Sequence, residues 1–457
     1  MSTTVLAGAT ILTVDAQRRI YDDGYLAFDD TGAIVAVGSR SDLPGALRDA
    51  GTVIDAHHCV IVPGFVDAHA HFGESVMRGL VPDDADPRAW LPDWLVPAYA
   101  TLEPGDERAA CDLTFAELLL TGTTTVSEAG TLLSWEAAAD AAEACGIRTQ
   151  LGRWTWDLPP KPERMHFASA TDALDAALAL IDGVRSRNNP RLTPALILLG
   201  IGTASPELLR EAPALAANRD VPLAMMYASV APEHGGAALP VSELERLGWL
   251  VPRTKLVHTV YVDPGDVAAL AAGGVSIVHC PSAALRHVKG IHRYGLFPEM
   301  LAAGVPVALG GDSANGSNHL NMLTLMYLAA TLYKDFRMDV SMIPPETALE
   351  MATIHGARAL GLGEQVGTLE AGKRADFVVF STEHPEWRPL LHPVQNLVLN
   401  ASDRSIDSVW VDGRKLVDRG RLLTLDIANV CERADVSAQR ILTRTGLRVP
   451  SLWPHIP

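Results

Sequence analysis

Eight short apolar runs alternate with Ala- and Leu-rich stretches through the middle of the chain, and this alternation limits the possible folds most strongly. Runs of this length suit strands, and the stretches between them suit helices. The strand candidates are 60–66, 123–128, 147–153, 196–202, 221–227, 254–259, 275–280 and 305–311; the helix candidates include 107–120, 134–145, 206–218 and 265–272. This order predicts an α/β fold, a (β/α)8 TIM-like barrel closed by a helix at 346–360, with its functional side chains at the carboxyl ends of the strands.

Both ends of the chain carry short strand patterns separated by turns. Asp30-Thr31-Gly32 is a turn signal between two alternating runs and predicts a hairpin. Similar patterns return late in the chain, so we expect residues 1–57 and 365–425 to build one small β-sandwich domain. The barrel would then span 58–364, and 426–457 would form a C-terminal helical tail.

The composition is that of an ordinary globular protein. Of 457 residues, 48% are hydrophobic and 20% charged, and the net charge of −17 disfavours nucleic acid or anionic membranes as partners. No apolar run approaches the roughly 20 residues that span a bilayer, and the N-terminus lacks a signal-peptide pattern. The five cysteines are scattered without C-x-x-C spacing. We expect a cytoplasmic protein that acts on a small molecule, with no nucleic-acid or membrane partner.

His69 and His71 stand two residues apart after the apolar run 60–66. Side chains at positions i and i+2 of a strand point to the same side, so the two imidazoles should converge on one point. Two converging imidazoles are a good start for a zinc or cobalt site. The pair therefore predicts a metal centre at the first barrel strand.

Acidic or imidazole side chains follow several other predicted strands. Asp312 comes after the eighth strand and supplies an anionic oxygen to complete a metal site with the two histidines. A bound divalent ion lowers the pKa of its water towards ~7, and Asp312 is placed to take the water proton. His258, at the end of the sixth strand, could polarise a substrate carbonyl, orient the water or bind the metal directly.

The remaining candidates have less defined roles. Glu128 ends the second strand and His279 the seventh, where a supporting role and a direct role are equally compatible with their positions. His287 lies in the loop after the seventh strand and is a candidate for substrate contact. His319 follows Asp312 closely and is a candidate for facing the same pocket.

Many ordered motifs along nearly the whole chain resemble the amidohydrolase superfamily. They include "PGFVDAHAH", "GTTTV", "LVHTVYVD", "IVHCPSAALR", "VPVALGGDSAN" and "ATIHGARALGL…VGTLEAGKRADFVVF". The chain resembles the branch that holds cytosine, guanine and S-adenosylhomocysteine deaminases and the triazine hydrolases. By position, the resemblance implies that His69, His71 and Asp312 are metal ligands. It also implies that His258 contacts water or substrate.

The fifth strand departs from the pattern of this branch, in which that strand usually ends with His-x-x-Glu. The segment "VPLAMMYASVAPE" places Met226 at the histidine position and Ser229 at the glutamate position. A thioether suits zinc poorly, so the fourth ligand stays open between His258, a water molecule and, more weakly, Tyr227. Binuclear members of the superfamily carry a carboxylated lysine at the end of the fourth strand. This chain has no lysine there, so the resemblance implies one divalent ion rather than two. Zinc is the expected ion, with cobalt, manganese and iron as alternatives.

The missing glutamate also bears on the substrate, because in the aminoazine deaminases that acid protonates a ring nitrogen. Attack on a carbonyl followed by loss of an amine needs only a metal, a polarising group and a base. In this respect the chain resembles phenylurea hydrolases and molinate hydrolase, which implies cleavage of the carbonyl–nitrogen bond of N-aryl ureas or carbamates. The alternatives are a hydrolytic deaminase or dechlorinase of a pyrimidine, purine or triazine, and a catalytically dead homologue.

An apolar aryl substrate would need a pocket of apolar and aromatic side chains. The candidates for its lining are Met225, Met226, Tyr227, Trp90, Trp94, Trp154 and Trp156. Relatives of this kind are often dimers or larger, so we also expect a homo-oligomer.

Overall fold

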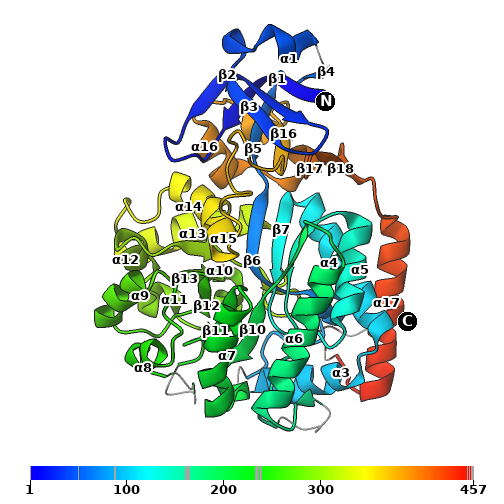
Figure 1. Ribbon diagram of the computed structural model, residues 1–457, viewed down its shortest axis with the longest axis vertical. Helices are drawn as coiled ribbons and strands as arrows, with labels where there is room; N and C mark the ends of the chain where they lie inside the picture. The colour runs from blue at the N-terminus through cyan, green and yellow to red at the C-terminus, as the bar shows by residue number, and fades with distance from the viewer. Residues whose placement is uncertain are drawn as a thin grey trace.

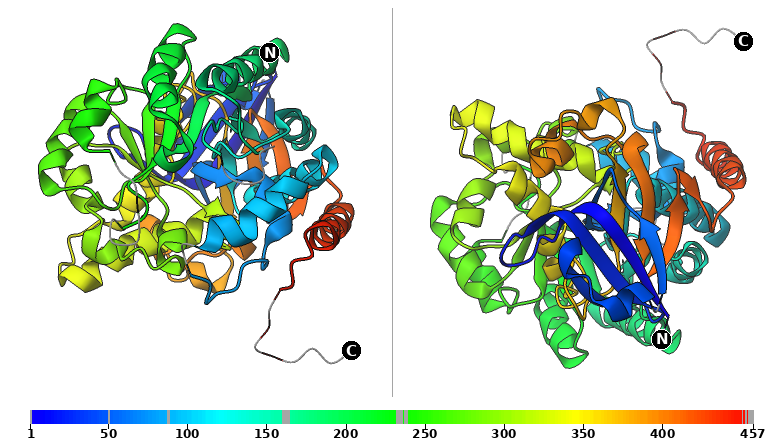
Figure 2. Two further views of the ribbon diagram at one scale, coloured as in Figure 1. Left: turned by 90° about the horizontal axis from the view of Figure 1, so that it is seen from below. Right: turned by 90° about the horizontal axis from the view of Figure 1, so that it is seen from above.

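The computed structural model (Figure 1) describes residues 2–49, 51–86, 89–159, 165–231, 236, 239–449, 451 and 453. The expected C-terminal tail therefore lies partly outside the described residues. Its described part is dominated by one helix, α17 (Ile427–Thr445), which begins at the side-chain cap of Asp426 and ends at Gly446. In the two views of Figure 2, α17 lies at the periphery of the molecule.

The middle of the chain forms two parallel five-stranded sheets. The first has the order β15-β6-β7-β8-β9 and the second the order β10-β11-β12-β13-β14. Their strands are β6 (Phe65–His71), β7 (Thr123–Glu128), β8 (Arg148–Leu151), β9 (Leu192–Pro194), β10 (Leu196–Gly200), β11 (Leu223–Tyr227), β12 (Thr254–His258), β13 (Ser276–His279), β14 (Val307–Leu309) and β15 (Asp312–Ser313). The chain passes from one sheet to the other after β9 and again after β14. This arrangement is consistent with a TIM-like barrel.

Helices connect most of these strands and pack around the sheets (Figures 1 and 2). They are α4 (Pro104–Leu120), α5 (Trp135–Cys145), α6 (Ala170–Ser186), α7 (Pro206–Asn218), α9 (Val267–Gly273), α13 (Met322–Arg337), α14 (Pro345–Met351) and α15 (Ile354–Ala359). Local chemistry sets several boundaries: Ser205 caps α7 by accepting a hydrogen bond from the backbone of Leu208. The single helix expected at 346–360 is instead two helices, because the chain leaves helical geometry at Thr353.

The strand expected at 60–66 is wrong as one element, because it divides at Gly64. Residues before the division form β5 (Cys59–Pro63), which pairs with β1 and β16 in another sheet, and residues after it begin β6. A Cβ atom at Gly64 would lie 2.1 Å from Oγ1 of Thr124, so only glycine fits this crossing. His69 and His71 consequently lie within β6 rather than after the strand.

Strands from both chain ends join in one nine-stranded sheet. Its order is β19-β18-β17-β16-β5-β1-β2-β3, with β4 paired to β1. The strands not yet introduced are β1 (Thr3–Leu12), β2 (Ile20–Asp29), β3 (Ile34–Ser39), β4 (Gly51–Asp55), β16 (Phe377–Ser381), β17 (Ile406–Val411), β18 (Arg414–Asp418) and β19 (Arg421–Leu422). The hairpin expected around Thr31 is present as the antiparallel pair β2–β3. A two-layer sandwich and the proposed domain boundaries stay predictions.

One buried ion pair links the chain-end region to the parallel sheets. Arg148, on β8, donates from Nε and Nη2 to the two carboxylate oxygens of Asp376 at 2.9 and 3.0 Å. Both side chains are only 1% exposed, and the two-pronged geometry satisfies both partners. None of the helices in the described ranges combines the length and the apolar character needed to cross a lipid bilayer.

Candidate active site

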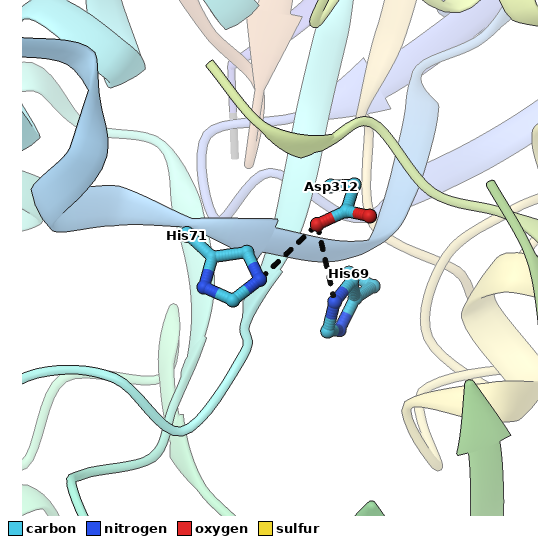
Figure 3. A group of neighbouring side chains, drawn as sticks. All are labelled: His69, His71 and Asp312. Carbon is cyan, nitrogen blue, oxygen red and sulfur yellow. Dashed lines mark ion pairs between the residues drawn. The ribbon is translucent and has the colours of Figure 1, made fainter. Parts of the chain in front are cut away.

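His69, His71 and Asp312 form a compact, buried group (Figure 3). Oδ1 of Asp312 lies 3.1 Å from Nε2 of His71 and 3.8 Å from Nε2 of His69. The strand register explains why these three side chains lie together. The two histidines flank Ala70 on β6 and point to the same side, and β15 pairs with β6 so that Asp312 stands opposite Ala70. Their ligand atoms lie within 4.8 Å of one another, which is close enough to share one cation after small adjustments.

His258 approaches the same carboxylate from the end of β12. Its Nε2 atom lies 3.7 Å from Oδ2 of Asp312, on the oxygen that does not face His71. Both residues have left-handed backbone conformations, with φ of 70° at His258 and 61° at Asp312. Such conformations are strained for side chains other than glycine and gather at functional sites. Here they coincide with the end of β12 and the start of β15.

The electrostatics of the group favour a cation. Burial raises the pKa of Asp312, but the hydrogen bond from His71 and the neighbouring imidazoles outweigh it, so this pKa lies well below the ordinary range. Burial also lowers the pKa of His69 well below its usual value. A neutral imidazole is the form that binds metals, and Nε2 of His69 is buried without a hydrogen-bond partner among the described residues. The donor set therefore fits a divalent ion such as zinc.

Polar side chains behind the group hold His71 in place. Nδ1 of His71 lies 3.1 Å from Oγ1 of Thr131 and 3.2 Å from Oε1 of Glu74. Glu74 in turn accepts hydrogen bonds from Asn315, at 2.7 Å, and from the hydroxyl of Tyr99. Burial alone would lower the pKa of His71, but Glu74 and Asp312 raise it to about 9, so this imidazole carries a proton that a bound metal ion would displace. This support fixes the ring orientation, as partners of metal-binding histidines commonly do.

Two further carboxylates support the backbone of the site. Asp67 accepts hydrogen bonds at 3.0 Å from the backbone N–H groups of His69 and Gly311, and burial raises its pKa to about 7. Glu128, one of the predicted residues, accepts from the backbone and hydroxyl of Thr131, at 3.1 and 2.9 Å for Oε2 and Oε1. Glu128 thus acts on His71 through Thr131. Glu74 and Asp67 were not predicted from the sequence, although their spacing from the histidines places both beside the pair.

A cavity of about 460 Å³ opens above the group. The polar lining residues include His71, Glu74, Thr131, His258, His287, Lys289, Asp312 and Ser313; the larger apolar ones include Trp90, Leu91, Leu95, Tyr99, Trp156, Leu199 and Met226. A mostly apolar wall with a few convergent polar groups is typical of a small-molecule site. Its volume is sufficient for a substituted aromatic ring.

The predicted lining is recovered in part. Trp90, Trp156 and Met226 line the cavity, whereas Met225, Tyr227, Trp94 and Trp154 are not among its lining residues. The hydroxyl of Tyr227 donates to the carbonyl of Leu239 at 2.6 Å. The alternation of side chains along β11 explains the division, because Met226 and its neighbours Met225 and Tyr227 point to opposite sides.

Of the three remaining predicted histidines, one lines the cavity and two do not. His287 lines the cavity and lies against Trp90, with ring centroids 4.1 Å apart. His279 lies off the cavity wall: it stacks on Phe297 at 4.0 Å, and burial lowers its pKa to about 3. His319 is exposed and is not a lining residue. His279, expected in either a supporting or a direct role, and His319, a candidate for facing the pocket, are thus both outside the cavity lining.

The end of β11 presents Met226 and Ser229 to the cavity. Neither side chain is a strong zinc ligand, and neither can act as a proton donor of carboxylic-acid strength. Cys280, by contrast, lies close to the centre: its sulfur groups with ligand atoms of His258 and Asp312 within 4.8 Å.

Comparisons with known proteins agree with this geometry. Residues 60–416 match the amidohydrolase family. The 5-methylthioadenosine/S-adenosylhomocysteine deaminase of Syntrophobacter fumaroxidans is 32% identical, over 96% of this chain and 98% of that protein. The enzyme of the same name from Moorella thermoacetica is 32% identical, over 89% and 92% of the two chains.

Two zinc-containing crystal structures are also similar. An adenosine deaminase from Xanthomonas campestris with bound zinc has a TM-score of 0.87 and 27% identity, over 97% of this chain and 99% of that one. An atrazine chlorohydrolase from Arthrobacter aurescens in complex with zinc has a TM-score of 0.85 and 25% identity, over 95% and 100% of the two chains.

The chain belongs to the amidohydrolase family. It is an enzyme of the class that hydrolyses non-peptide carbon–nitrogen bonds, and its relatives and the His-His-Asp group together support a metal-binding hydrolase. The relatives named above are deaminases and a chlorohydrolase. They favour the alternative expectation, action on a nitrogen heterocycle, over the main expectation of an N-aryl urea or carbamate hydrolase.

Proposed function

We propose that this enzyme is a metal-dependent hydrolase that removes an amino or chloro substituent from an sp² carbon of a nitrogen heterocycle of the purine, pyrimidine or triazine class. The observation that carries the proposal is the buried group of His69, His71 and Asp312 beneath a cavity of about 460 Å³. The deaminases and the chlorohydrolase among its relatives support the substrate class. We also treat the two parallel sheets as halves of one closed (β/α)8 barrel.

His69, His71 and Asp312 would hold one divalent ion, with His258 as the candidate for a further contact. Zinc suits this nitrogen and oxygen donor set, and zinc is present in both similar crystal structures. When bound, the ion would supply Lewis acidity that lowers the pKa of a water molecule in the cavity.

Asp312 would then accept a proton from the attacking water, and His258 would orient that water. The Oδ2 atom of Asp312 faces Nε2 of His258 at 3.7 Å, so a water proton can pass to the carboxylate while the imidazole orients the oxygen. Burial lowers the pKa of His258 well below its usual value, which keeps the ring neutral near pH 7. The water oxygen bonds to the ring carbon, the carbon–nitrogen bond breaks, and Asp312 returns the proton to the departing amine. Chloride leaves without a proton, and Asp312 then releases the water proton to solvent.

N-aryl ureas and carbamates remain a second candidate because of one specific feature. Met226 and Ser229 line the cavity at the end of β11, where the deaminase pattern described above has a histidine and a glutamate. Without that acid, a ring nitrogen lacks its proton donor, whereas attack on a carbonyl carbon does not need one.

A product-resolved substrate panel tests the proposal. The zinc-loaded enzyme would be incubated separately with adenosine, 5-methylthioadenosine, an aminotriazine, a chlorotriazine, an aminopyrimidine carboxylate, a phenylurea and an N-aryl carbamate, with Asp312→Asn as the blank. Release of ammonia or chloride from a heterocycle supports the proposal. Release of an aniline alone would replace it by the second candidate, and no turnover of any compound by metal-loaded enzyme would refute both.

A further inference from the structure

Lys289 lies in the loop between α10 (Pro281–Arg286) and α11 (Ile291–Tyr294) and lines the cavity. Its backbone is fixed at two points. The N–H group donates to the carbonyl of Ala284 at 2.9 Å, and the carbonyl accepts from the hydroxyl of Tyr261 at 2.7 Å. This anchored backbone holds Lys289 at the cavity, where it is one of the lining residues.

The ammonium group of Lys289 has no hydrogen bond or ion pair with the described residues, and this sets it apart from Lys255. Nζ of Lys255 donates to the carbonyl of Ala68 at 2.8 Å and to the hydroxyl of Ser127. A lysine that is partly removed from water without an acceptor is unfavourable unless a ligand supplies one. The three donors of Lys289 are therefore available to a molecule in the cavity.

The neighbouring basic groups cannot take this role. Arg286 is occupied: Nε donates to Asp83 at 3.1 Å, and Nη1 donates to the carbonyl of Gly316 at 2.9 Å. Burial lowers the pKa of His287 to about 4, with the Lys289 charge as a further cause, so that imidazole is neutral. Among the described residues that line the cavity, Lys289 is thus the lysine or arginine whose side-chain donors are free.

The charge of Lys289 reaches the proposed catalytic group. After burial, it is the largest cause of the lowered pKa of His258, and it interacts favourably with Asp312. Lys289, His258 and Asp312 line the same cavity. The wall also carries polar side chains, among them Glu74, Asp86, Thr131 and Ser313. Its apolar part includes Trp156, Leu199 and Met226, which are available to a flat ring.

We propose that Lys289 is a substrate-anchoring residue whose ammonium group binds an anionic oxygen substituent of the carboxylate type, carried on an aromatic ring that lies against the apolar wall. This inference rests on the proposed function and narrows its substrate class to ring compounds with an anionic oxygen group. Charge-assisted hydrogen bonds from lysine to a carboxylate are strong enough to select such compounds over neutral analogues.

Equilibrium titration calorimetry on the zinc-loaded, full-length enzyme tests the anchor with two simple probes. Benzoate carries the anionic group, and benzamide is its neutral analogue of similar shape. The native enzyme should bind benzoate at least ten-fold more tightly than benzamide. Lys289→Met should weaken benzoate binding at least ten-fold and change benzamide binding less than two-fold, whereas Lys289→Arg should retain most of the preference.

Two controls separate the anchor from a general change in charge and from a loss of metal. Lys334→Met, on α13 and outside the cavity lining, changes the net charge equally and should leave both affinities unchanged. Zinc content, measured on each sample, shows whether the metal is retained. An undiminished preference for benzoate in Lys289→Met would assign that preference to the metal and overturn the anchor, as would no preference in the native enzyme.

The two proposals can fail separately. If the heterocycle panel shows no turnover while Lys289→Met binds benzoate more weakly than the native enzyme does, the anchor stands and the proposed reaction falls. If heterocycles are hydrolysed and the probes bind equally to native enzyme and Lys289→Met, the reaction stands and the anchor falls.

Discussion

Oδ1 of Asp312 lies 3.1 Å from Nε2 of His71, although the two residues belong to strands from opposite ends of the parallel-sheet region. The pairing of β15 with β6 creates this contact, and it places the second oxygen of Asp312 towards His258. One carboxylate therefore serves two imidazoles from different strands. This sharing is the structural basis for assigning Asp312 both metal binding and proton transfer.

Removing one proposed ligand should abolish turnover without unfolding the protein. Asp312→Asn keeps the shape of the side chain, and asparagine tolerates the left-handed backbone at this position, so the fold should persist. We expect turnover to fall at least 10³-fold in Asp312→Asn and in His69→Ala. Activity assays combined with circular dichroism check this, and near-native activity in either folded variant would remove the proposed site.

Met226→His should strengthen metal retention. An imidazole at this cavity position would supply the nitrogen ligand that β11 lacks, and imidazole binds zinc far better than a thioether does. We expect metal loss to a chelator to slow at least ten-fold relative to the native enzyme. Met226→Leu is the matched control and should lose metal at the native rate. Equal rates in Met226→His and the native enzyme would mean that position 226 does not face the ion.

The stability of the protein should depend on His279 at mildly acidic pH. Burial lowers the folded-state pKa of His279 to about 3, so the unfolded chain takes up this proton first. The contribution of neutral His279 to the free energy of unfolding is fully present above its unfolded-state pKa of ~6.5. It declines as the pH falls towards the folded-state pKa. Between pH 7 and 5.5 the decline should be about 1.2 kcal/mol.

His279→Phe isolates the contribution of His279 to the pH dependence of stability, because a phenyl ring can keep the stacking on Phe297 without titrating. Urea unfolding at both pH values, compared between the variant and the native protein, cancels the other titrating groups that the two share. The decline in stability should be smaller in the variant by about 1.2 kcal/mol. Parallel pH profiles for the two proteins would show that His279 does not stay neutral in the folded state.

The ion pair between Arg148 and Asp376 should contribute strongly to stability. Both side chains are buried, and Asp376→Asn would leave the guanidinium with one remaining counter-charge, Asp412, whose Oδ1 lies 3.5 Å from Nη2. We expect the free energy of unfolding to fall by about 3 kcal/mol. Glu243→Gln is the control, because its partner Arg246 is exposed, and no measurable change is expected there. Denaturant unfolding of both variants gives the comparison; similar small effects would mean that water reaches Arg148.

The sequence was sufficient to predict the alternation of strands and helices and the convergence of His69, His71, His258 and Asp312. These features follow from local periodicity and from the rule that the carboxyl ends of parallel strands meet. The division of the first strand at Gly64 was not predicted, because the apolar run continues through the glycine. What separates β5 from β6 is the close approach of Thr124 from another strand, a tertiary contact without a local signal.

Side-chain direction caused the other differences. His279 ends a strand, as His258 does, yet it stacks on Phe297 away from the cavity. The register pairs Val257 with Val278, so simple alternation would turn the next residues, His258 and His279, to the same side. The left-handed backbone of His258, with φ of 70°, breaks this alternation, and no local sequence signal marks it. Glu74 was missed for a different reason: it lies in a short 3-10 helix after β6, where no periodic pattern marks it as buried.

The central claim is that His69, His71 and Asp312 hold one divalent ion, and elemental analysis of the purified enzyme tests it most directly. After zinc loading and dialysis, the native enzyme should retain one equivalent of zinc per chain, and folded Asp312→Asn should retain less than a tenth of that amount. Native enzyme without bound metal, or Asp312→Asn with a full equivalent, would contradict the account.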